Sequence, residues 1–237
     1  MKTGTFLLVI SILISGYNSF SEENRAPEQL IDVLGRTTDI KEIKNLINDM
    51  YTERQVLSVR FIRLLKKETN PDRKGWLIYL AGKLRLESAT GELIRNLDFV
   101  DVGPSMKTIG LPIWSPFPSQ DALIKIGMGS VEYLVDELAG KYYGHPDILV
   151  LNTIRLVIIY NVRHVDSIEL TKLILEGNYK DEKDPKKKEN LKKAIDLISQ
   201  ENYLALEEEY RRTVIRKAKK EYKNQEKKEV KTETTNP

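Results

Sequence analysis

The segment "PSQDALIKIGMGSVEYLVDELAG" (residues 118–140) contains two short amphipathic stretches separated by Gly-Met-Gly-Ser at 127–130. Each stretch has apolar residues three and four positions apart, which is the spacing of one helix face: Ala122, Leu123 and Ile126, then Val131, Leu134, Val135 and Leu138. Glycine tolerates the left-handed backbone conformation that ends many helices. The segment therefore predicts two helices joined by a sharp turn at Gly127.

Two other segments resemble this one. In residues 79–94 a helical pattern reaches Gly82 and is followed, after a short turn, by a second apolar pattern. In residues 158–174 Asn161 stands in the place of the glycine. The spacing from Gly82 to Gly127 is 45 residues, and that from Gly127 to Asn161 is 34. Since asparagine also tolerates the left-handed conformation, we expect Gly82 and Asn161 to end helices as Gly127 does.

The period and pattern of these segments resemble HEAT-type helical repeats, in particular the degenerate HEAT-like repeats of exported bacterial proteins. The resemblance covers about residues 39–200, with Asn161 as one departure and a weak match before residue 69 as another. It implies an all-α solenoid of stacked helical hairpins that presents a curved binding or scaffolding surface. Catalytic residues are not part of that motif, because the motif is structural.

Helical periodicity extends over most of the chain, with segments at 26–35, 39–51, 52–68, 73–84, 87–97, 146–162, 166–177 and 184–200. Asn70-Pro71-Asp72 predicts a break and a new helix start. Segment 146–162 is apolar on nearly all sides, which predicts a buried helix because it is too long for an ordinary strand. We expect a repeat domain at 22–200, with a proline-rich insertion at 98–119 that holds Pro104, Pro112, Pro116 and Pro118.

The N-terminus has the pattern of a signal peptide. Lys2 precedes an apolar core at residues 6–14, and the small residues Ser19 and Ser21 predict cleavage after Ser21. As a helix this core is about 14 Å long, short of the roughly 30 Å hydrocarbon layer. We expect export to the periplasm or the medium, with an uncleaved membrane anchor as the alternative.

Several kinds of chemistry lack their residues in this sequence. The chain has no cysteine and only two histidines, His145 and His164, which do not have metal-ligand spacing. The "GMG" at 127–129 is not followed by the Lys-Ser/Thr of a phosphate loop. We therefore predict a protein without catalytic activity, cofactor or metal.

Aromatic residues in two loops are the candidates for partner binding. Trp114 and Phe117 lie among prolines in "LPIWSPFP" (111–118), and Tyr142 and Tyr143 lie in "KYYGH" (141–145). Aromatic side chains in rigid loops are common interaction anchors. The alternative for both pairs is that the rings pack against the repeat domain.

The C-terminal part, residues 201–237, differs from the rest in composition. Residues 211–231 contain ten Lys or Arg and three Glu. We expect a docked helix at 203–222 followed by a disordered end. The tail either covers the last repeat, or contacts an anionic membrane surface or envelope polymer. Binding to nucleic acid is disfavoured by the expected export and by a net charge of only +3.

These observations together predict an exported scaffold or protein-interaction module whose partner the sequence does not identify. A peripheral envelope protein that binds anionic surfaces through residues 211–231 is the first alternative. An accessory subunit of an enzyme is the second.

Overall fold

The computed structural model describes residues 40–52, 54–100, 117–163, 166–213 and 216. Throughout these residues the regular structure is helical, without a strand, which confirms the all-α class for this part of the chain. The predicted signal segment at 1–21, the helix at 26–35, residues 101–116 and the chain after 216 lie outside the described residues. The elements in chain order are α3 (Ile40–Thr52), α4 (Arg54–Lys67), α5 (Pro71–Lys83), η1 (Glu87–Ala89), α6 (Thr90–Arg95), α8 (Pro118–Ile126), η2 (Gly127–Ser130), α9 (Val131–Leu138), α10 (Asp147–Asn161), α11 (Ser167–Asp181) and α12 (Pro185–Gln200).

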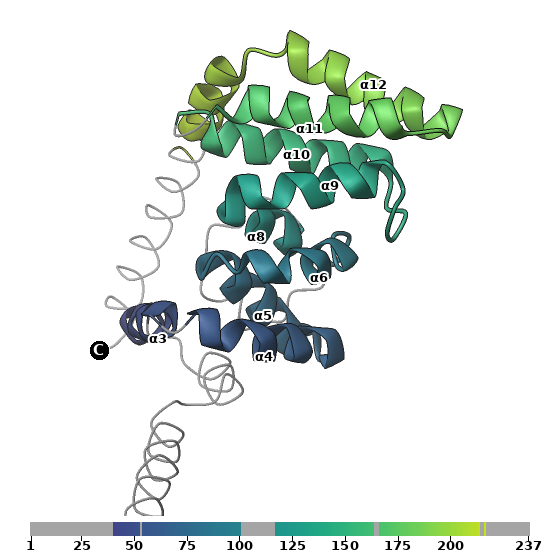
Figure 1. Ribbon diagram of the computed structural model, residues 1–237. Coiled ribbons are helices and arrows are strands. Elements are labelled where there is room, and N and C mark those ends of the chain that lie inside the picture. Colours follow the sequence, from purple (N-terminus) through teal and green to yellow (C-terminus); the bar gives the residue numbers. More distant parts are fainter. Residues whose placement is uncertain (1–39, 53, 101–116, 164–165, 214–215, 217–237) are drawn as a thin grey trace, which may run out of the picture.

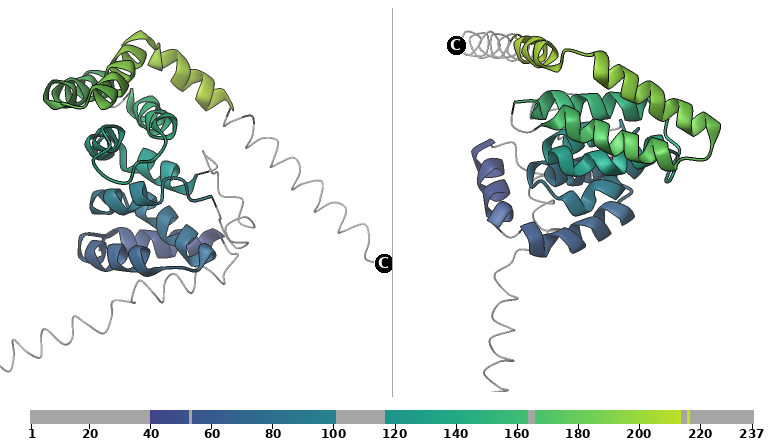
Figure 2. Two further views of the ribbon diagram at one scale, coloured as in Figure 1. Left: turned by 90° about the vertical axis from the view of Figure 1, so that its right-hand side faces the viewer. Right: turned by 45° about the horizontal axis from the view of Figure 1, so that its top comes forward.

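The helices follow one another from α4 and α5 at one end of the molecule to α12 at the other (Figure 1). Contacts run along two rows: α5 packs against α8 and α8 against α10, while α6 packs against α9 and α9 against α11. The apolar core lies between these rows. At the end of the stack, α12 packs mainly on α11 (Figure 2). Each helix thus buries its apolar face against the next helix along the chain and against the next helix in the same row.

The predicted turn at Gly127 is confirmed. Gly127 ends α8 with a φ of 85° and a ψ of −145°, a conformation that only glycine adopts readily. The chain then makes one short 3₁₀ helix, η2, before α9 begins at Val131. The buried Ser130 hydroxyl donates a hydrogen bond of 2.8 Å to the carbonyl oxygen of Gly127, which keeps the turn closed.

The predicted helix end at Asn161 is confirmed, but the left-handed conformation expected at Gly82 and Asn161 is not found. Gly82 lies inside α5, and the left-handed residue at that turn is Arg85, with a φ of 50°. A Cβ at Gly82 would come within 2.5 Å of the Cα of Ala122, so this glycine permits close packing of α5 on α8. Asn161 is the last residue of α10, and its side chain donates a 2.7 Å hydrogen bond to the carbonyl oxygen of Val157.

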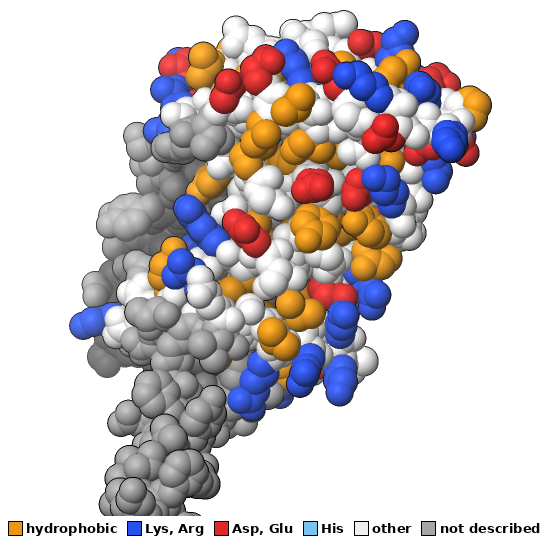
Figure 3. Space-filling model, in the orientation of Figure 1, with side chains coloured by type: hydrophobic (Ala, Val, Ile, Leu, Met, Phe, Trp, Pro, Cys, Tyr) orange, Lys and Arg blue, Asp and Glu red, His pale blue; other side chains and the backbone are white. Residues whose placement is uncertain are grey.

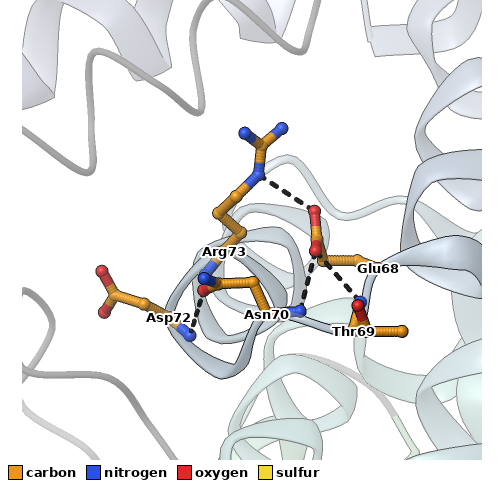
Figure 4. A network of polar contacts seen from close by, with 5 residues as sticks. All are labelled: Glu68, Thr69, Asn70, Asp72 and Arg73. Atoms are coloured by element: carbon orange, nitrogen blue, oxygen red, sulfur yellow. Dashed lines mark hydrogen bonds and ion pairs between the residues drawn. The ribbon is translucent and has the colours of Figure 1, made fainter.

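The α4–α5 turn is held by side chains on both sides of Pro71 (Figure 4). Asn70 caps α5, because its Oδ1 accepts hydrogen bonds from the backbone N–H groups of Asp72 and Arg73 at 3.0 and 3.1 Å. Glu68 Oε1 accepts from the N–H groups of Thr69 and Asn70, and Glu68 Oε2 accepts from Arg73 Nε at 3.0 Å. The predicted break and helix start at Asn70-Pro71-Asp72 are confirmed.

The same turn occurs again between α11 and α12. Glu182 Oε1 accepts hydrogen bonds from the N–H groups of Lys183 and Asp184, both at 2.8 Å. Asp184 caps α12 by accepting from the N–H groups of Lys186 and Lys187, with Pro185 as the first helical residue. A Glu-x-Asx-Pro motif, present as "ETNP" at 68–71 and "EKDP" at 182–185, therefore starts a helix near each end of the molecule.

The predicted helix at 146–162 is confirmed as α10, but it is buried along one side only. Ile154, Val157 and Ile158 are in the core, whereas Ile148 and Tyr160 are exposed.

No helix among the described residues combines the length and the apolar character needed to cross a membrane.

Residues 203–213 form a further helix beside the end of α10. Tyr203 is fully buried, and the carboxylates of Glu201 and Glu207 accept hydrogen bonds from Arg155 and Arg163 of the α10 region. This part of the tail is therefore attached to the helical stack by both apolar and ionic contacts.

Candidate functional site

The four aromatic candidates from the sequence are distributed over two regions. Trp114 lies outside the described residues, and Phe117 is the half-buried residue that precedes α8. Tyr142 and Tyr143 lie in the loop between α9 and α10, where their side chains are 49% and 41% exposed. Each tyrosine thus has about half of its surface in solvent and the rest against the repeat domain.

The loop that holds Tyr142 and Tyr143 is fixed by one buried carboxylate. Glu137 is 2% exposed, and its two oxygens accept hydrogen bonds from the backbone N–H groups of Tyr143 and His145, each at 2.8 Å. Gly140 and Gly144 have φ values of 68° and 75°, which allow the tight path between them. The tyrosines are thus presented on a constrained backbone, although they project from a loop.

Asp136 connects Tyr142 to the neighbouring helix α11. The Tyr142 hydroxyl donates a 3.2 Å hydrogen bond to Asp136 Oδ2. Lys141 Nζ donates to Asp136 Oδ1 at 2.7 Å and to Asn178 Oδ1 of α11 at 2.8 Å. Partial burial and the nearby Asp136 carboxylate raise the pKa of Tyr142 above its ordinary value.

Tyr143 makes contacts of a different kind. The guanidinium of Arg95, at the end of α6, lies 5.2 Å from the centre of the Tyr143 ring, a cation–π distance. The ring also lies 6.1 Å from that of Tyr142 and 6.2 Å from that of His145. Both tyrosine rings therefore have neighbours that limit their motion, while much of each ring stays exposed to solvent.

A surface pocket of about 580 Å³ adjoins this loop. Its lining comes from α9, the loop after it and α11: Glu132, Asp136, Lys141, Leu173, Ile174, Gly177, Asn178, Asp181 and Glu182. Four carboxylates and one ammonium group give the lining a net charge of −3, and Leu173 and Ile174 supply apolar surface. The pocket is thus both acidic and partly apolar.

The pocket and the tyrosines form one continuous surface. Asp136 belongs to the pocket and bonds to Tyr142, and Tyr133 and Glu132 of α9 lie close enough to influence the Tyr142 hydroxyl. We call the pocket together with Tyr133, Tyr142 and Tyr143 the tyrosine–acid surface. Figure 3 shows hydrophobic side chains gathered over α9 to α11, with acidic side chains between them.

A second cluster of polar groups lies between α5 and α8. The ammonium groups of Lys125 and Lys83 lie 5.0 and 5.6 Å from the ring centre of Tyr79. Burial lowers the pKa of Lys125 to about 8, against the opposing effect of the Asp121 carboxylate. Burial, reinforced by Asp121, raises the pKa of Tyr79 and of Tyr210, which comes from helix 203–213, to about 12.

Neither the pocket nor this second cluster was predicted from the sequence. Lys125 is a polar residue on an amphipathic helix, and its spacing four residues after Asp121 is a weak signal by itself. The pocket joins residues of α9 and α11, so no local pattern contains it. The exposed position and the open cavity make the tyrosine–acid surface the better candidate for binding, whereas the Lys125 cluster is largely covered.

Within the described ranges, no three His, Asp or Glu side chains are grouped so that they could hold a metal ion. No protein-family model, curated protein or solved structure matches this chain.

Proposed function

We propose that this chain is an exported HEAT-like helical scaffold that binds another protein through the tyrosine–acid surface. The observation that carries the proposal is the pair of exposed tyrosines, Tyr142 and Tyr143, on a loop fixed by Glu137. Tyrosines are frequent interface anchors because they offer a large contact area and a hydroxyl group with little loss of conformational freedom.

The arrangement of the helices supports the scaffold part of the proposal. Helices α5, α8 and α10 pack in one row and α6, α9 and α11 in the other, as expected for stacked helical hairpins. Repeats of this kind bind partners on continuous surfaces formed by several units. The tyrosine–acid surface has this property, since its residues come from α9, α11 and the loop that follows α9.

The location is part of the same proposal. The apolar core at 6–14 and the small residues at Ser19 and Ser21 support export with cleavage after Ser21. The partner would then be another protein of the cell envelope or the medium.

Site-specific photocrosslinking in cells that produce the chain tests this function. A benzophenone side chain replaces Tyr143 in one variant and Leu204 in a control, because Leu204 is 55% exposed on helix 203–213, which contributes no residue to the pocket lining. We expect a discrete crosslinked protein from position 143 that disappears when Tyr142 is also changed to alanine. Equal crosslinking from both positions, or none from position 143, would contradict the proposal.

The alternative function is binding to anionic surfaces through residues 211–231. Within the described part of this segment, Arg211 and Arg212 form ion pairs with Glu207 and Glu208 of the same helix. Their charges are thus partly balanced. Sedimentation with vesicles that contain anionic lipid distinguishes the two functions: salt-sensitive binding that requires the lysines and arginines of 211–231 would favour the alternative.

A further inference from the structure

We propose that the acidic pocket between α9 and α11 takes a lysine or arginine side chain of the partner, together with an adjacent apolar residue. This inference rests on the proposed function and adds the chemistry of the segment that binds. It depends on the charge, the shape and the internal contacts of the pocket.

The described residues neutralise the charge of the pocket only in part. Lys141 is the single basic residue of the lining, and it bonds to Asp136 and Asn178. Glu182 accepts hydrogen bonds from two backbone N–H groups. Among the described residues, however, the carboxylates of Glu132 and Asp181 form no hydrogen bond or ion pair.

The position of Lys141 shows that a cationic group fits at this place. Its ammonium group crosses from α9 to α11 and bonds to an oxygen on each helix, at 2.7 and 2.8 Å. A basic side chain of the partner would bring a second cation to this pocket, whose lining also includes the carboxylates of Glu132 on α9 and Asp181 on α11. The negative charge of the pocket would favour a basic segment of the partner and repel an acidic one, which makes the contact selective.

The shape of the pocket has a specific cause. Gly177 is at its lining on α11, and a Cβ at this position would meet no atom within 4 Å. The helix surface is therefore open where most residues would place a side chain. The volume of about 580 Å³ exceeds the roughly 300 Å³ at which ligand sites begin, so it holds more than one side chain.

The apolar part of the lining matches the rest of a basic side chain. Leu173 is 67% exposed, and Ile174 is partly buried beside it. Lysine and arginine place their methylene groups along apolar surface while the charged end stays at the polar rim. An apolar residue next to the basic one would cover the remaining surface of Leu173.

The test is a titration of the chain from Glu22 onward with short blocked peptides, followed by backbone NMR shifts of residues 131–141 and 173–182. The probe is acetyl-Leu-Arg-Leu-amide, and its uncharged match is acetyl-Leu-citrulline-Leu-amide. We expect the arginine peptide to bind weakly and at low salt, because both carboxylates are near the surface and salt screens them. Its affinity should be at least tenfold higher than that of the citrulline peptide, which lacks the charge. Equal affinity for the two peptides would overturn the proposal.

Three variants locate the binding within the pocket. Glu132→Gln combined with Asp181→Asn removes the two carboxylates without ion pairs, and we expect at least a tenfold loss of affinity. Gly177→Leu fills the open space without changing the charge, and we expect a loss of similar size. The matched control is Glu176→Gln, which removes one charge from the same helix outside the lining; a loss as large as that of the double variant would overturn the proposal.

Two other occupants are outcomes of the same experiment. If residues 217–231 of the same chain filled the pocket, replacing their lysines by glutamine would tighten peptide binding, which would overturn the proposal of an external partner. If a second copy filled it, sedimentation would show a dimer that the Glu132→Gln, Asp181→Asn variant loses, with the same consequence. A partner crosslinked at position 143 that is insensitive to the pocket variants would refute this inference while leaving the proposed function intact.

Discussion

At the scale of single residues, Gly127 makes the hairpin between α8 and α9 possible. Its φ of 85° and ψ of −145° are strained for any other residue, and an added Cβ would lie 3.2 Å from Asn161 Oδ1. We expect Gly127→Ala to lower the free energy of unfolding by about 1–3 kcal/mol, measured by urea denaturation. Gly91→Ala in α6 is the control, since a Cβ there meets nothing within 4 Å; it should be neutral or stabilise by up to about 1 kcal/mol.

Asn70 is the second residue with a defined local role, as the cap of α5. We expect Asn70→Ala to lower the free energy of unfolding by about 1 kcal/mol, because two backbone N–H groups lose their acceptor. Asn70→Asp should leave stability within about 0.5 kcal/mol of the starting protein, since Asp184 has this role in the other Glu-x-Asx-Pro turn. Thermal denaturation of the two variants side by side measures both effects. An equal loss of stability in both would show that Asn70 does not stabilise the protein by capping α5.

At the scale of elements, helix 203–213 is attached to the turn after α10 through the carboxylate of Glu207. Glu207 accepts hydrogen bonds from Arg163 at 2.7 Å and from Arg211 at 3.0 Å. The hydrogen bond with Arg163 is the main reason that the pKa of Glu207 is lowered. A lowered carboxyl pKa means that this contact stabilises the docked helix above the ordinary pKa of glutamate, about 4.3, and is lost as pH falls through the lowered value.

We therefore expect Glu207→Gln to increase amide hydrogen exchange across residues 203–213 at neutral pH, while α8 keeps its protection. Glu208→Gln is the matched control: this neighbour is 58% exposed on its side chain and pairs only with Arg212 among the described residues. Hydrogen exchange followed by mass spectrometry measures both. Similar exchange in the two variants would mean that the contact with Arg163 does not hold the helix in place.

At the scale of the whole molecule, the cluster between α5 and α8 predicts an unusual dependence of stability on pH. The pKa of Lys125 is about 8 in the folded chain and about 10.4 in an unfolded one, so the unfolded state binds more protons between these values. The free energy of unfolding should therefore rise with pH in this window. Tyr79 and Tyr210, with pKa values of about 12 against an ordinary value near 10, act in the opposite direction above about pH 10.

The measurement is urea denaturation at pH 7.5 and 9.5. We expect the starting protein to be more stable at the higher pH, and Lys125→Met to lose this difference because the partly buried ammonium group is gone. Lys193→Met removes an exposed lysine that pairs with Glu189, and it should keep the difference. Identical pH dependence in Lys125→Met and the starting protein would show that Lys125 is not its source.

Much of the local structure could be predicted from the sequence, because its causes are local. The spacing of apolar residues sets the helices, and Gly127 and Asn70-Pro71 mark turns whose geometry depends on the residues themselves. The prediction went wrong where a residue serves a neighbour in space. Gly82 was expected to take the left-handed conformation, but it allows the close approach of Ala122 to α5, and Arg85 takes the left-handed conformation instead.

The candidate site was predictable only in part. Tyr142 and Tyr143 stand out in the sequence as aromatic residues in a loop, but their exposure depends on how Glu137 holds that loop. The acidic pocket has no signature in the sequence, since Glu132 and Asp181 belong to separate helices and each looks like an ordinary surface residue. The sequence by itself determined the helices and the turns at Gly127 and Asn70-Pro71, because backbone preference and apolar periodicity act over a few residues. Only the tertiary structure decided which charges share a surface, because that depends on how α9 and α11 pack.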